Sequence, residues 1–126
     1  MAENRKVKNT HPKEYNGVLY RSTLEAKAAK YLTESGLPFE YEPFKITLLP
    51  SMKYNGKTVR AVTYCPDFVC NNYIIEVKGW KTDRWIIKQK LIISMILRGD
   101  IPYEFREVHT IMELKQVIDE IRNERT

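Results

Sequence analysis

Hydrophobic positions follow two different periods along the chain. Three stretches repeat apolar residues every three or four positions, which is the spacing of an amphipathic helix. The first and the last of them open on capping boxes, Ser22–Glu25 and Thr110–Glu113, and the middle one runs from about Asp83 to Arg98. Gly36 and Gly99 follow the first two stretches and are expected to end them. The pattern therefore predicts three helices.

Alternation of apolar and polar residues predicts several short strands. Asn16-Gly17 and Asn55-Gly56 are typical of the two-residue turns of β-hairpins. Further strands are expected at residues 59–64, 67–70, 73–78 and 103–108. Because helices lie before, between and after these strands, the order indicates an α/β or α+β fold in which a mixed sheet is flanked by helices.

The length of 126 residues, with 43% hydrophobic and 29% charged residues, fits one globular domain. Residues 1–14 are polar and basic and are expected to form a flexible arm, followed by a single domain at residues 15–126. We find neither a signal peptide nor an apolar run near the roughly 20 residues that cross a bilayer. Two cysteines are too few for a disulfide framework. We therefore expect an intracellular, cytoplasmic protein without a membrane partner.

Basic residues outnumber acidic residues, 21 to 16, and the excess is concentrated after position 77. Residues 78–98 hold six basic side chains and one acidic side chain, whereas residues 104–126 hold four basic and six acidic ones. Four of the basic side chains are candidates for contacts with DNA phosphates: Lys81, Arg84, Lys88 and Lys90. The alternative is a solvated helix face, with Ile87, Leu91 and Met95 packed inward. No motif typical of sequence-specific recognition is present.

The pair Asn71-Asn72 separates two strands whose register can be counted from the turn. If these asparagines form a two-residue loop, Asp67 lies opposite Glu76, and Lys78 shares their face of the sheet. A symmetric four-residue loop gives the same register, while a three-residue loop shifts it by one. The other face is apolar and is expected to pack in the core, with Phe68, Ile75 and Val77.

Two carboxylates that face each other across a sheet repel and weaken the pairing of their strands. A divalent cation between Asp67 and Glu76 converts this repulsion into a binding site, because Mg²⁺ favours one or two carboxylates with waters and phosphate oxygens. Lys78 is then placed to orient or deprotonate an attacking water, or to offset charge on a phosphorane. The alternative is that these polar residues form the solvent face of a half-buried sheet.

Pro66-Asp67 followed by Glu76-Val77-Lys78 resembles the PD-(D/E)xK signature of the restriction-endonuclease-like nuclease superfamily. A wider set of segments is similar to small phage nucleases related to endonuclease-I-type Holliday-junction resolvases: Tyr20–Glu25, Tyr64–Val69, Ile75–Gly79 and Lys81-Thr82. The similarity covers roughly residues 15–108. It implies a restriction-endonuclease-like fold, with a central mixed β-sheet flanked by helices.

The resemblance also implies a role for each matched residue. Asp67 and Glu76 correspond to metal ligands, with the Val77 backbone carbonyl as a third. Lys78 corresponds to the catalytic lysine, and Glu25, on the first helix, to a catalytic glutamate that is a further candidate ligand. The alternative role of Glu25 is to cap its helix as the fourth residue of the capping box. The implied cofactor is Mg²⁺, and Mn²⁺ is expected to substitute for it.

The expected function is that of a metal-dependent, structure-selective DNA endonuclease of the phage Holliday-junction resolvase type. The preference for branched DNA rests on the resemblance alone. Two alternatives are a nuclease for ordinary duplexes or transposon ends, and a DNA-binding protein without catalysis. A chain this short holds one active site, so cutting two strands predicts a homodimer, joined by the apolar last helix or by an exchanged N-terminal element. The implied location is the cytoplasm of a phage-infected bacterial host.

Overall fold

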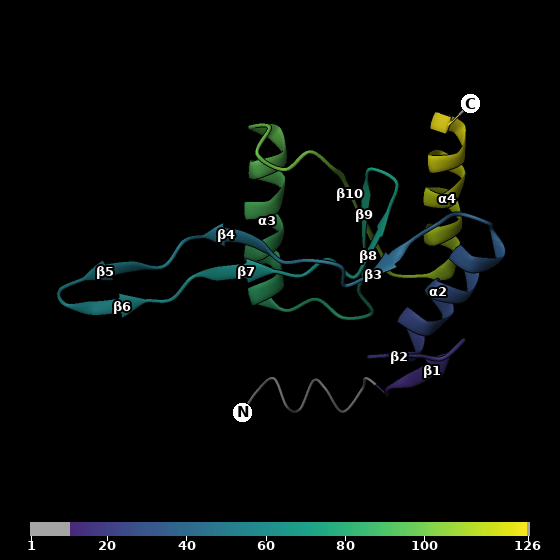
Figure 1. Cartoon of the computed structure of the whole chain (residues 1–126), viewed down its shortest axis with the longest axis horizontal. Helices are drawn as coiled ribbons and strands as arrows, with labels where there is room; N and C mark the ends of the chain where they lie inside the picture. Colours follow the sequence, from purple (N-terminus) through teal and green to yellow (C-terminus); the bar gives the residue numbers. More distant parts are fainter. Residues whose placement is uncertain (1–10, 126) are drawn as a thin grey trace.

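The computed structural model describes residues 11–125, which form a mixed sheet between helices (Figure 1). The helices are α2 (Thr23–Glu34), α3 (Asp83–Leu97) and α4 (Ile111–Arg125). The strands are β1 (Lys13–Tyr15), β2 (Val18–Tyr20), β3 (Glu40–Tyr41), β4 (Ile46–Leu49), β5 (Met52–Tyr54), β6 (Lys57–Val59), β7 (Val62–Tyr64), β8 (Phe68–Cys70), β9 (Tyr73–Val77) and β10 (Glu104–Val108). The expected α/β class is confirmed, and the arrangement is consistent with a restriction-endonuclease-like fold.

Four strands form the central sheet in the order β10-β9-β8-β3. β10 and β9 are parallel, whereas β9 pairs antiparallel with β8, and β8 with β3. The β8-β9 hairpin aligns Phe68 with Ile75 and Cys70 with Tyr73, which is the register predicted for a two-residue loop. Because parallel neighbours need a crossover connection, the chain passes through α3 between β9 and β10.

Helices cover both faces of this sheet, and each face has its own hydrophobic core (Figure 1). On one face, α2 and α4 pack with Phe68, Ile75 and Val77, as predicted for these three residues. On the other face, Trp85 of α3 is buried together with residues of β4, β7 and β9. Glu76 alternates onto this second face and is only 3% exposed. The alternative of a half-buried sheet with a solvent face is therefore wrong at this strand.

Side-chain caps begin the first and last helices as the sequence predicts. Ser22 Oγ accepts the Glu25 N–H at 3.1 Å before α2, and Thr110 Oγ1 accepts the Glu113 N–H at 3.2 Å before α4. The middle helix ends at Leu97, one residue before its expected end. The capping residues were sufficient to predict where these two helices begin, because each cap satisfies a backbone N–H that the helix itself leaves without a partner.

The predicted arm and one predicted strand differ from the structure by more than a single terminal residue. β1 begins at Lys13, inside the arm predicted for residues 1–14, of which residues 1–10 lie outside the described part of the chain. The single strand predicted at residues 59–64 is divided into β6 and β7. Pro50 lies between their partner strands, β4 and β5, and has no N–H to donate, so the ladder is interrupted there.

The last helix uses its apolar face within the chain itself. Leu114, Val117, Ile118 and Ile121 of α4 are all buried in the core that α2 and the sheet share. This face is therefore not available to a second chain, and the prediction that it joins two chains is wrong. The exchange of an N-terminal element stays a prediction.

The middle helix packs differently from the inward orientation considered for Ile87, Leu91 and Met95. Leu91 and Met95 are partly buried against the second core, but Ile87 is 61% exposed. The inward orientation is wrong for Ile87 because the buried face of α3 is centred on Trp85 and Ile92, which lie on a different side of the helix.

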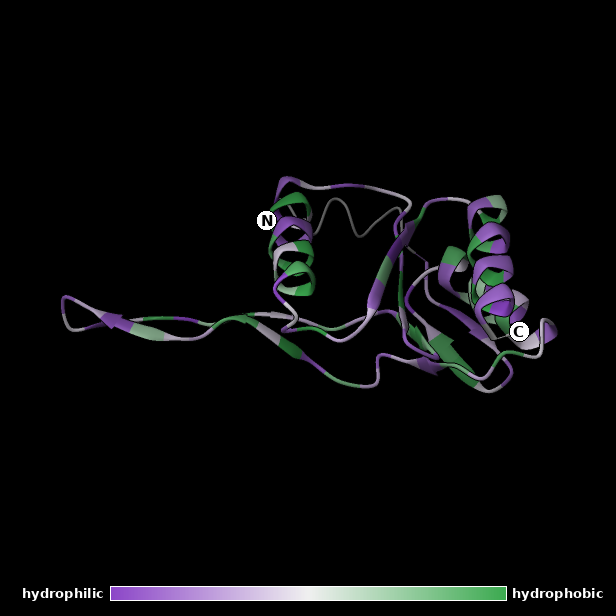
Figure 2. Cartoon of the chain, turned by 90° about the horizontal axis from the view of Figure 1, so that it is seen from above, coloured by the Kyte–Doolittle hydropathy of each residue, from purple (hydrophilic) through white to green (hydrophobic). Residues whose placement is uncertain are grey.

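Beyond the sheet and its covering helices, β5 and β6 extend as a narrow two-stranded ribbon that projects past α3 (Figures 1 and 2). Met52 pairs with Val59, and Tyr54 pairs with Lys57 around the Asn55-Gly56 turn that the sequence predicts. No helix within residues 11–125 has both the length and the apolar character needed to cross a membrane.

Candidate active site

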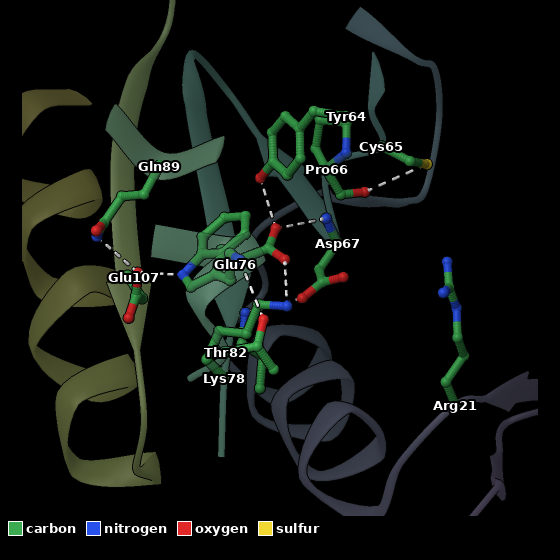
Figure 3. A network of polar contacts seen from close by, with 12 residues as sticks. Arg21, Tyr64, Cys65, Pro66, Asp67, Glu76, Lys78, Thr82, Gln89 and Glu107 are labelled. Carbon is green, nitrogen blue, oxygen red and sulfur yellow. Dashed lines mark hydrogen bonds and ion pairs between the residues drawn. The ribbon is translucent and has the colours of Figure 1, made fainter. Parts of the chain in front are cut away.

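Asp67 and Glu76 meet at the end of the β8-β9 hairpin, as their predicted register requires. Asp67 lies one residue before β8, and its backbone N–H donates to Glu76 Oε1 at 3.4 Å. Asp67 Oδ2 in turn accepts the Val77 N–H at 2.9 Å. Figure 3 shows both carboxyl groups turned toward the same space, which Lys78 also borders. The hairpin therefore brings together three residues that the sequence analysis selected.

Both carboxyl groups are buried, at 7% and 3% exposure for Asp67 and Glu76. Burial raises the pKa of Asp67 well above its ordinary value, and the neighbouring charges of Glu76 and Glu25 raise it further. Burial also raises the pKa of Glu76, although the hydrogen bond from Tyr64 and the charge of Lys78 act to lower it. The site thus concentrates negative charge where water stabilises it poorly.

Tyr64 holds the Glu76 carboxylate and was not among the predicted site residues. Its hydroxyl donates a hydrogen bond to Glu76 Oε1. Burial raises the pKa of Tyr64, so this side chain remains a hydrogen-bond donor at neutral pH. The residue ends β7, three positions before Asp67, and alternation alone does not reveal that its hydroxyl turns toward the site.

Lys78 follows β9 directly and supplies the positive charge of the site. Its Nζ lies 3.6 Å from Glu76 Oε2 and 4.5 Å from the centre of the Trp85 ring. A cation above an indole face is stabilised by the ring quadrupole, and the side chain remains 29% exposed. Lys78 is therefore held beside Glu76 while its ammonium group still reaches solvent.

Glu25 lies close to this pair, but other groups hold it. It is buried on α2, where Tyr41 Oη donates to its Oε1 at 2.6 Å and the Arg21 N–H at 3.2 Å. The predicted capping box is thus only half formed, because the carboxylate accepts the N–H of Arg21 rather than that of Ser22. Within residues 11–125, no three His, Cys, Asp or Glu side chains are grouped so as to hold a metal ion.

Glu107 is a further carboxylate with a buried side chain, and it was not among the predicted site residues. It lies beside Glu76 in the parallel β9-β10 pair. Its Oε1 accepts hydrogen bonds from Trp85 Nε1 at 2.9 Å and from Gln89 Nε2 at 2.8 Å, both on α3 (Figure 3). Its Oε2 lies 2.9 Å from His109 Nε2. The only signal in the sequence was an acidic residue on an otherwise apolar face of β10.

The predicted DNA contacts lie on α3 and just before it. Lys81 is paired with Glu107 Oε2 at 3.5 Å and is half exposed, so part of its charge is already neutralised. Arg84 and Lys90 are exposed, and Lys88 is partly buried. Arg84 and Lys88 are one turn apart and share a side of the helix, whereas Lys90 lies on another side. The four residues therefore do not form one continuous face.

Comparison with known proteins places these features in a family. Residues 6–112 match the family described as Phage endonuclease I, and all of the candidate catalytic residues fall inside this match. The chain belongs to the phage endonuclease I family. It is 39% identical over 67 residues to Endonuclease I of Escherichia phage T7, which is 51% of this chain and 40% of that protein. The match thus spans less than half the length of this curated relative, and no solved structure matches the chain.

The donor groups of this phage endonuclease I family member fit a hard divalent cation. Asp67 and Glu76 offer carboxylate oxygens, and the Val77 backbone lies beside Asp67, whose Oδ2 accepts the Val77 N–H at 2.9 Å. Burial raises the pKa of both carboxyl groups, and the charge of Lys78 acts to lower both. Two carboxylates with further oxygen donors are the usual protein ligands of Mg²⁺.

Proposed function

We propose that this chain is a Mg²⁺-dependent endodeoxyribonuclease that hydrolyses phosphodiester bonds in branched DNA, in the manner of a phage Holliday-junction resolvase, and that it is a PD-(D/E)xK nuclease. One observation carries the proposal. Asp67 and Glu76 are two buried carboxylates on facing strand ends, joined by the Asp67 backbone N–H that donates to Glu76, and the Lys78 ammonium lies 3.6 Å from Glu76. Burying two like charges together destabilises a fold, and a bound catalytic cation would offset this repulsion.

In the proposed site, Asp67, Glu76 and the Val77 carbonyl hold the metal, and Glu25 approaches from α2 as a further candidate ligand. When bound, Mg²⁺ supplies Lewis-acid polarisation of the scissile phosphate and lowers the pKa of an attacking water. Mn²⁺ has similar oxygen ligands and is expected to replace it. Tyr64 orients Glu76 by donating to one of its oxygens, which leaves the other oxygen on the side of Lys78.

Lys78 acts on the reacting groups in this proposal. Its ammonium group orients the attacking water or stabilises the negative charge that develops on the phosphoryl oxygens. The Trp85 ring and Glu76 fix its position, since both lie within 4.5 Å of Nζ. Preorganised charge of this kind requires little rearrangement during the reaction, which is why the lysine contributes to rate more than to binding.

DNA binding is assigned to the basic residues around α3: Lys81, Arg84, Lys88 and Lys90. Trp80, at 60% exposure, is available to stack on an unpaired base, whereas Trp85 is buried and is not. Phosphate contacts of this type position a duplex without reading its sequence. In this proposal a homodimer supplies the two active sites that a four-way junction requires, and the protein acts in the cytoplasm of a phage-infected bacterial host.

A junction-cleavage assay tests the proposed function. The full chain is incubated in Mg²⁺ with a four-way junction and with a linear duplex of the same sequence, and Asp67→Asn is the inactive control. We expect preferential cleavage of the junction, with cleavage lost and binding retained in the variant. Equal rates on both substrates support a general duplex nuclease instead. Binding without cleavage in either Mg²⁺ or Mn²⁺ supports a non-catalytic DNA-binding protein.

A further inference from the structure

The ribbon formed by β5 and β6 has no part in either hydrophobic core. Every residue from 49 to 61 is exposed, a run of consecutive exposed positions that includes both strands and their turn. Figures 1 and 2 show the ribbon extending away from the sheet on the side of α3. Asn55 and Gly56 have φ angles of 52° and 75°, as a tight hairpin turn that matches strand twist requires. The Asn55-Gly56 turn therefore sets the shape of the ribbon, which has no buried side chains to stabilise it.

The charge of this segment is of one sign. Between Glu42 and Asp67 the chain has no acidic residue, although it has four basic ones: Lys45, Lys53, Lys57 and Arg60. Three of these four lie on or next to the exposed ribbon. The rest of the chain mixes both signs, with 16 acidic residues in all. A projecting surface with only positive charge is complementary to a polyanion rather than to a protein of mixed charge.

The two faces of the ribbon each carry a cation. Lys53 pairs with Thr58, and Tyr54 pairs with Lys57, so Lys53 and Lys57 point to opposite faces. A two-stranded ribbon fits the major groove of B-DNA, whose two walls are lined by phosphates. A ribbon in that groove therefore presents one lysine toward each wall. The Tyr54 side chain, which is 71% exposed, lies beside the turn on the same face of the ribbon as Lys57.

We propose that the β5-β6 ribbon is a second DNA-binding element, which enters the major groove of a duplex arm and contacts its phosphates through Lys53, Lys57 and Arg60. This inference rests on the proposed function, because it assumes that DNA is the substrate. It adds a contact region separate from α3. Its partner is the double-stranded arm beside the cleavage site, and not the branch point itself.

The ribbon is joined to the active site by a short stretch of chain. Lys57 precedes Asp67 by ten residues, and a fully extended chain of this length spans at most about 35 Å. That distance equals about one turn of B-DNA. The ribbon therefore reaches phosphates within about ten base pairs of the scissile bond, so arms longer than this contain its whole binding site, and shortening them well below this length removes phosphates that it can contact.

The first experiment measures the salt dependence of DNA binding in EDTA, where the metal site cannot act. The variant K53Q/K57Q/R60Q is compared with K27Q/K30Q/K115Q, which removes the same charge from exposed positions of α2 and α4. For a junction with 20-base-pair arms, we expect the ribbon variant to bind about tenfold more weakly. The slope of log K against log salt should shrink by about two to three, since each phosphate contact contributes about 0.9. Equal slopes for the two variants overturn the proposal.

The second experiment varies the length of the junction arms. Shortening them from 20 to six base pairs should weaken the wild-type protein and the control, and should leave the ribbon variant nearly unchanged. An equal loss for all three proteins contradicts the ribbon contact. A fall in oligomer mass of the ribbon variant, with an unaltered salt slope, assigns the ribbon to contact between chains and also overturns the proposal.

These outcomes are separable from a failure of the proposed function. Binding in EDTA does not depend on catalysis, so the ribbon contact can hold even for a protein that never cuts DNA. Conversely, cleavage of short-armed junctions at saturating protein is expected to be equal for wild type and ribbon variant. All three substituted side chains are exposed, so thermal melting should place the variants close to the wild type.

Discussion

At the scale of single residues, Asp67 and Glu76 show how folding opposes ionisation. Burial raises the pKa of both carboxyl groups, so the folded chain binds protons more tightly than the unfolded chain. This tighter proton binding stabilises the folded chain fully below about pH 4, which is the pKa of the two carboxyl groups in the unfolded chain. The stabilisation is lost as the pH rises through their pKa in the folded chain. The metal-free protein is therefore expected to become less stable from mildly acidic to neutral pH.

Asp67→Asn removes one of these charges and keeps an oxygen for the Val77 N–H. We expect the variant to melt a few degrees above the wild type at pH 8 in EDTA, since 1 kcal/mol corresponds to about 4 °C for a domain of this size. The difference should shrink toward pH 4. Added Mg²⁺ or Mn²⁺ should raise the melting temperature of the wild type and not that of the variant. Asp119→Asn, on the exposed surface of α4, is the control, and equal pH profiles for the two variants contradict this electrostatic account.

Tyr64→Phe tests the hydrogen bond that holds Glu76. Without the hydroxyl, the pKa of Glu76 rises further, because this bond lowers it in the wild type. A hydrogen bond to a charged group contributes about 1.5–3 kcal/mol, so we expect divalent-cation affinity to fall about tenfold or more. The acidic limb of the pH–rate profile should move to higher pH. Tyr41→Phe removes the matching bond to Glu25, and an equal effect there would show that the Tyr64 bond has no special role.

The placement of Asp67 opposite Glu76 was predictable because strand alternation and a two-residue loop leave only one register. The roles of Tyr64 and Glu107 were not predictable in the same way. Tyr64 reaches Glu76 from β7, a strand outside the central sheet, and Glu107 reaches Trp85 from β10 across the crossover. Both contacts depend on how separate elements pack, which the period of one segment does not encode.

At the scale of elements, Glu107 connects β10 to α3 and thereby supports the position of Lys78. It accepts hydrogen bonds from Trp85 and Gln89, and the Trp85 ring lies under the Lys78 ammonium. The link also extends to the end of β9, since His109 Nδ1 donates to the Lys78 carbonyl at 2.6 Å. β9, which carries Glu76, is thus held in place by groups on its parallel neighbour β10 as well as by its hairpin partner β8.

Glu107→Ala leaves the indole N–H and the Gln89 amide without their buried acceptor. We expect a loss of about 2–4 kcal/mol in the free energy of unfolding, with an unchanged urea m-value. Activity at a temperature where the variant is folded should fall through kcat, because Lys78 loses its support. Glu107→Gln keeps an acceptor and should recover most of the stability. A stable Ala variant with full activity contradicts the supporting role.

At the scale of the whole molecule, one chain presents one candidate site, and the buried face of α4 excludes one predicted way of joining two chains. The number of DNA strands cut in one binding event therefore indicates whether two chains act together. Wild-type chains and Asp67→Asn chains are mixed, refolded together and tested on a plasmid that extrudes a four-way junction. If the proposed homodimer acts, mixed dimers should nick the plasmid while wild-type dimers linearise it. A product ratio that depends only on the amount of wild-type chain, with no excess of nicked plasmid, contradicts the dimer.

We expect Asp67 and Glu76 to bind one divalent cation beside Lys78. Crystals of the protein soaked in Mn²⁺ test this directly through the anomalous scattering of the metal. We expect a peak between the two carboxylates, within ligand distance of both and of the Val77 carbonyl, and no such peak in Asp67→Asn crystals. A wild-type map without a peak at this position, or carboxylates that turn away from each other, would contradict it.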